Sequence, residues 1–280
     1  MNGACSITLS NAHYARFPFT RFLQNQRSLH RTQISLYSAV PHVLLDHQNI
    51  EEAAHVKAAL EEYGLCAETM IPSNYGYSLF ADPGTEHYAI SLAYYQNCVR
   101  AAKQIGVRVL CLRPQHGRMD RDRQAHLDGC IAMLKEILVT AEAYSMPIAL
   151  GTAAPKDAAA LHTLPELCSV LREVEHPMLG ALLDTHIMSQ AGETVEQWMT
   201  ALGDRVYHVF LSDGRTSGYC VWGKGIYPIS NYWDTLLRFG YQHGTTCFVP
   251  DFSDNDNPEA VDRIHHNKIL CSEGVSSCTN

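Results

Sequence analysis

Short runs of apolar and β-branched residues alternate along the chain with longer amphipathic stretches. The stretches, such as "EHYAISLAYYQNCVRAAKQIG" and "QAHLDGCIAMLKEILVTAEAYS", repeat apolar residues at helical spacing and end at Gly or Ser. The runs have the composition of buried strands. They lie at residues 4–10, 33–37, 65–71, 107–113, 147–151, 179–184, 206–212 and 245–250.

Strands that alternate with helices over short links favour a parallel sheet with right-handed crossovers. Eight candidate strands is the number that a closed barrel needs. We therefore predict a single-domain α/β fold, the (β/α)8 TIM barrel, with an open doubly wound sheet as the alternative. The pattern fades after about Ile264. We expect residues 1–265 to form the barrel, and residues 266–280 a last helical turn and a frayed tail.

The composition narrows the possible partners. The chain has 280 residues, of which 46% are hydrophobic and 18% charged, and this is enough apolar material for one large core. Its formal net charge of -8 argues against nucleic acid and an anionic membrane, because both attract clustered Lys and Arg. No apolar run reaches the roughly 20 residues that cross a bilayer. We therefore expect a soluble protein that binds a small molecule.

The cysteines carry information about the compartment. The ten of them are spread singly from Cys5 to Cys278, without a CxxC pair. This spacing favours neither a disulfide framework nor a thiolate zinc site. The sequence also shows no signal peptide, so a cytoplasmic location is expected.

Polar side chains gather where the predicted strands end. In a barrel these ends meet on one face, where the loops carry the chemistry. Each residue alone also fits a turn former or a helix cap, so their joint placement is what indicates a site. The candidates are His208, His116 and Asp184 for proton transfer, and Asn74, Tyr77, His186, Asp213 and Lys224 for substrate contact; Arg113 and Asp251 belong to the same loops.

Two long segments carry a family resemblance. The text "LLDTHIMSQAGETVEQWMTALGDRVYHVFLSDG", followed by "VWGKG", resembles the distal half of the sugar phosphate isomerase/epimerase family, the xylose isomerase-like TIM barrels. The segments "AETMIPSNYGYSLFADPGTEHYAIS" and "QHG" are most similar to its fructoselysine 3-epimerase and ketose 3-epimerase branch. The resemblance runs from about residue 4 to residue 265. It implies a barrel that binds a sugar or sugar phosphate at its mouth and assembles as a dimer or tetramer.

The resemblance also implies a metal mechanism. In that family Mn²⁺ or another divalent ion is bound by Glu, Asp, His and Glu from four strand ends, and it clamps two neighbouring substrate oxygens. The two glutamates exchange a proton with the carbon between them. Such a proton becomes removable only when a cation stabilises the developing enediolate and a base lies on the correct face.

Of those four ligands, Asp184 alone is carried over. The first glutamate falls on Gly151, the histidine on Phe210, and the last glutamate on Phe248 or Val249. None of these side chains coordinates a divalent ion, which takes carboxylate oxygen or imidazole nitrogen. We therefore expect no cofactor, and the loss of the usual divalent-metal mechanism.

A shifted metal site is the alternative. Residues two apart in a strand share a face, so His208 points the same way as Phe210. Asp251 likewise shares a face with Val249. A site made of Asp184, His208 and Asp251 would move each new group by about 6–7 Å along its strand, away from the common focus.

Other positions also depart from the family pattern. His186 follows Asp184 by two residues where the family has three, and on a strand this would reverse its facing. Cys220 stands in place of a histidine before the loop after the seventh strand, and Trp222 in place of the proline of that loop. Side chains that could contact a sugar are better kept than those that the metal chemistry needs.

Three functions stay open. The first is an isomerase or epimerase with a modified mechanism, in which His208 or His116 is the base and Asp184 its partner. The second is a non-catalytic pseudoenzyme that binds a sugar or regulates a partner enzyme. The third is a metal-independent lyase or hydrolase that uses the carboxylates of the rim.

Overall fold

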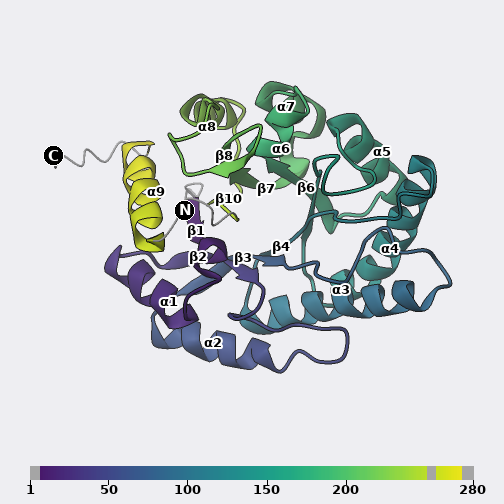
Figure 1. Cartoon of the computed structure of the whole chain (residues 1–280), viewed down its shortest axis with the longest axis horizontal. Helices are drawn as coiled ribbons and strands as arrows, with labels where there is room; N and C mark the ends of the chain where they lie inside the picture. The colour runs from purple at the N-terminus through teal and green to yellow at the C-terminus, as the bar shows by residue number, and fades with distance from the viewer. Residues whose placement is uncertain (1–6, 251–256, 273–280) are drawn as a thin grey trace.

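Eight parallel strands close into a barrel in the structure, a computed structural model that describes residues 7–250 and 257–272. β1 pairs with both β2 and β10, so the ring closes and the open doubly wound sheet is excluded (Figure 1). The predicted TIM barrel is confirmed, and each of its strands lies within a predicted run or one residue beyond it. The barrel strands are β1 (Ile7–Ser10), β2 (Gln33–Ser38), β3 (Cys66–Pro72), β4 (Val109–Leu112), β5 (Ile148–Gly151), β6 (Leu179–Asp184), β7 (Val206–Leu211) and β10 (Gly244–Cys247).

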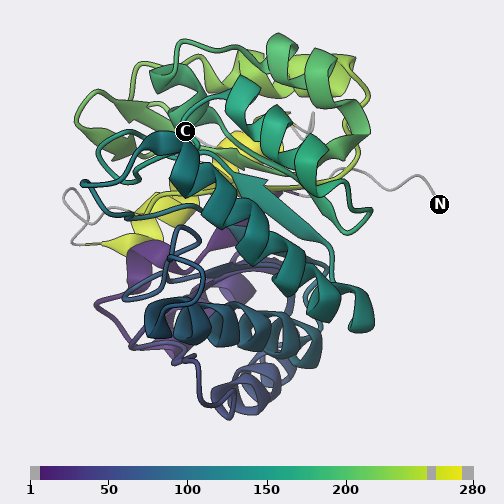
Figure 2. The same ribbon diagram turned by 90° about the vertical axis from the view of Figure 1, so that its right-hand side faces the viewer.

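Helices surround the ring of strands, as Figures 1 and 2 show. The two longest described helices, α3 and α4, pack side by side (Figure 2). A short antiparallel hairpin of β8 (Asp213–Arg215) and β9 (Gly218–Cys220) follows β7. The helices are α1 (Phe19–Ser28), α2 (Glu52–Glu62), α3 (Glu86–Ile105), α4 (Arg123–Ala143), α5 (Leu164–Val174), α6 (Thr185–Gln190), α7 (Val195–Leu202), α8 (Ile229–Arg238) and α9 (Pro258–Ser272), with 3₁₀ turns at Ala12–Tyr14 and Gly203–Arg205.

Local sequence explains where several helices begin and end. Thr194 and Gln197 form a capping box: the amide of Thr194 donates to Gln197 Oε1 at 2.8 Å, and the amide of Gln197 donates to Thr194 Oγ1 at 3.2 Å. Thr85 accepts a hydrogen bond from the amide of Tyr88 at the start of α3. Gly106, at φ 93°, ends that helix in the left-handed conformation.

The barrel interior is filled by side chains at two levels. The level farther from the carboxyl ends of the strands is polar: Thr246 Oγ1 is 3.0 Å from Thr8 Oγ1 and 2.8 Å from His208 Nε2. Toward the carboxyl ends of the strands an apolar cluster takes over. It consists of Ala12, Ile71, Cys111, Ala149, Leu182, Phe210 and Phe248, which are all buried. The interior is therefore a packed core, and any ligand must bind above this cluster or in the loops.

The last described helix, α9, continues to Ser272, and Ile269 packs into the core. Residues 273–280 lie outside the described part. None of the described helices is long and apolar enough to cross a membrane. The cysteines of the described part are all free thiols.

Candidate site at the carboxyl end of the barrel

Arg113, Tyr219 and Asp184 form a hydrogen-bonded network at the mouth of the barrel. Arg113 follows β4, Tyr219 lies in β9, and Asp184 is the last residue of β6. Arg113 Nη2 donates to the hydroxyl of Tyr219 at 2.7 Å, and that hydroxyl donates to Asp184 Oδ2 at 2.8 Å. Arg113 Nη2 and Asp184 Oδ2 are 3.9 Å apart. Burial raises the pKa of Tyr219 well above its ordinary value, so the phenol stays protonated and can donate to the carboxylate.

An aromatic floor lies beneath this network. The rings of Phe210 and Phe248 are stacked with centroids 4.6 Å apart, and Tyr37 and Tyr219 meet Phe248 edge-on at 6.4 and 6.1 Å. The guanidinium carbon of Arg113 lies 5.3 Å from the centre of Phe248. A cation over an aromatic face is attracted by the quadrupole of the ring, so the floor helps to hold Arg113 in place.

The donor set does not fit a divalent metal. Phe210 and Phe248 are fully buried apolar rings, and Gly151 has no side chain. A Cβ atom added at Gly151 would lie 3.2 Å from Leu182 Cδ2, so a longer side chain there would need local rearrangement. Within residues 7–250 and 257–272 no three His, Cys, Asp or Glu side chains are grouped to hold a metal. The shifted site falls partly outside the described residues, because Asp251 is not among them.

The structure does not bring His208 to the mouth. In the sheet Asp184 pairs with Phe210 while Leu182 pairs with His208, so His208 lies two residues deeper in the barrel than Asp184. It is fully buried, and burial lowers its pKa to about 3. Phe210 is two residues nearer the carboxyl end of the strand, and its ring contacts that of His208 with centroids 5.6 Å apart. The role of His208 as a base next to Asp184 stays a prediction.

His186 does lie next to Asp184. The strand ends at Asp184 and a helix begins at once, so the reversed facing expected from a strand does not arise. The amide of His186 donates to Asp184 Oδ1 at 3.0 Å, and its ring packs on Tyr219 with centroids 4.2 Å apart. Burial lowers the pKa of His186, so its imidazole is neutral at pH 7. Gly214 makes room for this ring, because a Cβ there would lie 2.1 Å from His186 Nδ1.

Asp213 organises a loop instead of facing a ligand. Its carboxylate accepts hydrogen bonds from the amides of Gly214, Gly223, Gly225 and Tyr227 at 2.8 to 3.2 Å. The side chain is buried, and four backbone donors occupy both of its oxygens. Asp213 thus holds this loop in place, and its role as a substrate contact stays a prediction.

Lys224 and Asn74 differ in their exposure to solvent. Lys224 is exposed on the loop that Asp213 holds, and its carbonyl accepts a hydrogen bond from Arg215 Nη2 at 2.6 Å. Asn74 is buried, and its side-chain amide donates to the carbonyl of Arg113. Asn74 thus holds the loop that carries Arg113.

Tyr77 and His116 belong to a separate cavity. This cavity, of about 500 Å³, lies between the loop after β3 and the loop after β4. The predicted candidates are therefore divided in the structure: Asp184 and His186 lie together at the mouth, and Tyr77 and His116 lie in the neighbouring cavity. Sequence reasoning missed Tyr219, because a tyrosine in a hairpin carries no sign that its hydroxyl reaches a strand end.

Comparisons with known proteins agree with this architecture. The model of one protein family, the xylose isomerase-like TIM barrel, matches residues 33–265. Fructoselysine 3-epimerase of Shigella flexneri is 20% identical over 236 residues, which cover 83% of this chain and 86% of that protein.

Two solved structures share the fold over nearly their whole length. D-psicose 3-epimerase of Clostridium cellulolyticum H10, in a complex with D-tagatose, superposes with a TM-score of 0.76 at 15% identity, over 97% of this chain and 99% of that one. The 3-keto-D-glucoside 4-epimerase of E. coli superposes with a TM-score of 0.76 at 14% identity, over 96% and 99% of the two chains.

Proposed function

The chain belongs to the xylose isomerase-like TIM barrel family, and from this premise we propose that it binds a small sugar or sugar phosphate at the mouth of the barrel without a divalent metal. The relatives that it resembles include epimerases of fructoselysine and of D-psicose. From these relatives we infer the class of ligand, a sugar or sugar phosphate. We do not infer their metal-assisted chemistry, because the residues that would bind the metal are replaced here.

The observation that carries the proposal is the setting of Arg113. Its side chain is 15% exposed, and it lies beside a carboxylate that is 2% exposed. A guanidinium has five N–H donors. Among the described residues, the side chain of Arg113 donates one hydrogen bond, to the hydroxyl of Tyr219. The other donors remain for the oxygens of a sugar or a phosphate, which a planar guanidinium binds well. A fixed positive charge thus stands at the mouth where relatives are expected to use a metal.

Binding without turnover is the function that this geometry supports best. The two glutamates that would exchange a proton have no counterpart, and His208 is buried beneath Phe210. Tyr219 is protonated and already donates its single hydroxyl hydrogen to Asp184, and it is a poor base because its pKa is raised. Arg113, Tyr219 and Asp184 would then orient the ligand through hydrogen bonds.

Calorimetric titration with D-fructose and D-fructose 6-phosphate tests the proposal. We expect binding in EDTA with the same Kd as in added Mn²⁺. Arg113→Met keeps an unbranched side chain as far as the position of Nε but removes the guanidinium and its charge. It should weaken binding tenfold or more, since a hydrogen bond from a charged group contributes about 1.5–3 kcal/mol. Arg238→Met is the matched control, because Arg238 is 67% exposed on α8.

Two results would contradict the proposal. One is a requirement for stoichiometric Mn²⁺, and the other is an unchanged Kd in Arg113→Met. Incubation of D-fructose with the protein in D₂O separates binding from turnover, because deuterium next to the carbonyl would show that a proton is exchanged.

A further inference from the structure

The cavity between the loops after β3 and β4 has the properties of a small-molecule site. Its volume of about 500 Å³ falls within the range of about 300–1,000 Å³ that such sites occupy. Its walls include the aromatic rings of Tyr75, Tyr77 and Phe80, with His87 and His116 as polar groups. Aromatic walls with a few converging polar groups are the usual lining of a pocket that binds an organic ring.

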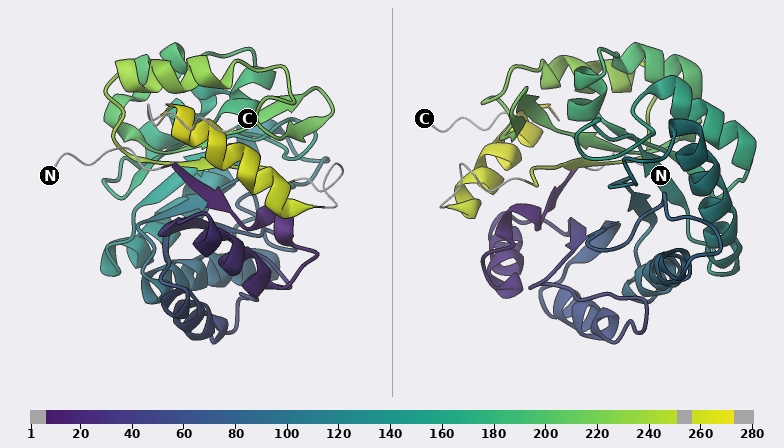
Figure 3. Two further views of the ribbon diagram at one scale, coloured as in Figure 1. Left: turned by 90° about the vertical axis from the view of Figure 1, so that its left-hand side faces the viewer. Right: turned by 45° about the vertical axis from the view of Figure 1, so that its right-hand side comes forward.

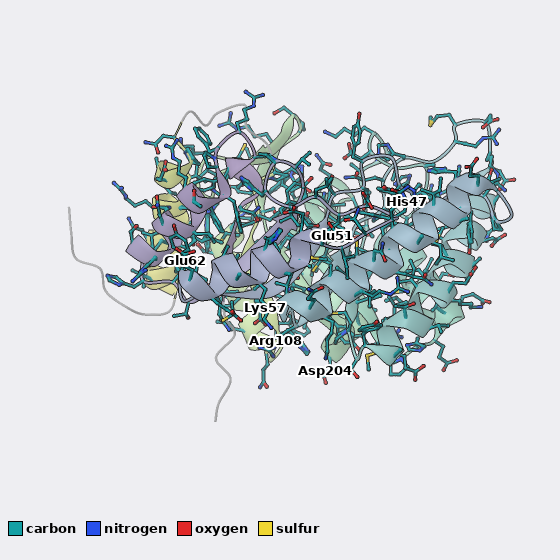
Figure 4. All side chains as sticks on the ribbon, turned by 90° about the horizontal axis from the view of Figure 1, so that it is seen from below. His47, Glu51, Lys57, Glu62, Arg108 and Asp204 are labelled. Atoms are coloured by element: carbon teal, nitrogen blue, oxygen red, sulfur yellow. The ribbon has the colours of Figure 1, made fainter. Side chains whose placement is uncertain are left out.

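Tyr77 gives this cavity a rigid wall. Its ring is stacked on that of Tyr94, with centroids 3.9 Å apart and planes at 6°. Its hydroxyl is 3.2 Å from Nδ1 of His47, which is labelled in Figure 4. The hydroxyl of Tyr94 in turn donates to the carbonyl of Ser73. Because its position is held from two sides, Tyr77 can present its ring without rearrangement, which lowers the entropic cost of binding.

His116 lies in the cavity with a backbone conformation that is uncommon outside glycine. Its φ is 63°, in the left-handed region. The backbone is held there by two hydrogen bonds of 2.8 Å, from its amide to the carbonyl of Asp157 and from the amide of Ala159 to its carbonyl. No described residue forms a hydrogen bond with its imidazole. Strain of this kind persists when the surroundings impose it, and it is often found in binding sites.

Gly117 lets the loop after β4 pack closely against the segment that contains Ala159. It has φ 110°, and a Cβ at this position would lie 2.5 Å from the Cβ of Ala159. A side chain at residue 117 would therefore push the two loops apart. The close contact of these loops keeps the backbone of His116 fixed at the edge of the cavity.

The loop after β4 carries both Arg113 of the proposed sugar site and His116 of the cavity. Asn74 holds the carbonyl of Arg113, and the hydroxyl of Ser78 donates to the carbonyl of Gln115 at 3.2 Å, so one loop supports both regions. Arg113 and His116 are three positions apart along the chain, so their Cα atoms lie at most about 11 Å from one another. A single ligand with two rings is long enough to contact both.

We propose that this cavity is a second subsite, which holds the further ring of a two-ring saccharide or glycoside whose first ring lies at Arg113, with His116 as a hydrogen-bonding group. The inference rests on the proposed function, because it needs a sugar at the mouth. It makes the preferred ligand a sugar conjugate larger than a monosaccharide. His116 acts in recognition, and no proton transfer is assigned to it.

Titration with D-fructose and with lactulose, which joins a second hexose ring to fructose, tests the subsite. We expect lactulose to bind at least tenfold tighter than D-fructose. His116→Gly should remove this advantage and leave the Kd of D-fructose unchanged. The same change should not lower the melting temperature, since glycine adopts a positive φ without strain.

A matched control exists in the same chain. His30 also has a positive φ, of 55°, and is exposed at the end of α1, outside the lining of the cavity. His30→Gly should behave like His116→Gly in melting temperature but leave the affinity for lactulose unchanged. The pair therefore separates a change of backbone strain from the loss of an imidazole.

The possible outcomes are distinct. If D-fructose binds and lactulose binds no tighter, or if His116→Gly keeps the advantage of lactulose, the subsite is wrong and the proposed function stands. If neither sugar binds, the proposed function itself fails, and the subsite fails with it.

Discussion

Asp213 shows at the level of one residue why a polar side chain in a promising place need not contact a ligand. It follows β7 at the rim, where chemistry is expected in a barrel. Its carboxylate is nevertheless filled by four backbone amides of its own loop. Arg113 is the opposite case, because few of its donors are used by the described residues. The two residues differ in how many side-chain hydrogen-bonding groups the described residues leave without a partner.

Asp213→Asn should destabilise the protein. An amide offers one acceptor oxygen in place of two, so about two charged hydrogen bonds are lost, and we expect the free energy of unfolding to fall by about 3 kcal/mol or more. Urea denaturation measures this value. Asp234 is exposed, so Asp234→Asn should change the free energy of unfolding by less than about 0.5 kcal/mol. Equal stability of the two variants would show that Asp213 does not hold the loop.

At the scale of an element, β7 shows how two side chains on one face can have different surroundings. His208 and Phe210 are two residues apart and point the same way, as the pleat requires. His208 lies in the polar lower level with Thr246, while Phe210 stacks on Phe248 under the mouth. The strand was predicted correctly, but which of its residues a ligand could reach depends on the depth of each in the barrel.

The buried imidazole of His208 predicts a loss of stability in mild acid. Burial lowers its pKa to about 3 in the folded protein, whereas in the unfolded chain it is about 6.5. As the pH falls below about 6.5, the unfolded chain binds a proton that the folded chain does not bind until about pH 3. The contribution to stability is therefore complete above pH 6.5 and is lost between about pH 6.5 and 3, by about 1.4 kcal/mol per pH unit.

Urea denaturation at pH 7.5 and at pH 5 measures this loss, in a range where most carboxylates stay ionised. His208→Gln should make the fall in unfolding free energy between the two pH values smaller. Burial also lowers the pKa of His265 to about 3. His265 therefore lowers the unfolding free energy in acid as well, and its part of the fall remains in the His208→Gln variant. His55→Gln, at an exposed histidine, should leave the fall unchanged. A His208→Gln protein with the same pH dependence as the parent would refute the assignment.

At the scale of the whole molecule, a buried cluster joins the last described helix to the first one. α9 and α1 lie side by side in Figures 1 and 3, where the last and first segments of the ring meet. Asp262 of α9 is fully buried, and it accepts hydrogen bonds of 2.7 Å from Tyr14, Asn25 and Gln26. Nε2 of His13 lies 3.0 Å from the other oxygen of Asp262. This cluster ties the last helix to the first, beside the β1–β10 pair that closes the barrel.

Asp262→Ala should therefore weaken the closure of the barrel. Removal of one partner leaves several buried polar groups without a counterpart, and such changes cost about 3–5 kcal/mol. We expect a lower urea midpoint and faster proteolysis within α9. Arg263→Ala, at the exposed neighbouring position, is the control and should change the free energy of unfolding by less than about 0.5 kcal/mol. If both variants resist proteolysis equally, the cluster does not hold α9.

The barrel could be predicted from the amino-acid sequence, because helical and strand spacing are local properties that can be read over a few residues. Through the family resemblance the sequence also predicts that Gly151 and Phe210 stand where relatives are expected to carry metal ligands, and these residue types do not coordinate a metal. The tertiary structure decided which polar groups share a site. Arg113 and Tyr219 are separated by 106 positions and meet through one hydrogen bond. Contacts of that kind follow from the closure of the ring, and no local pattern encodes them.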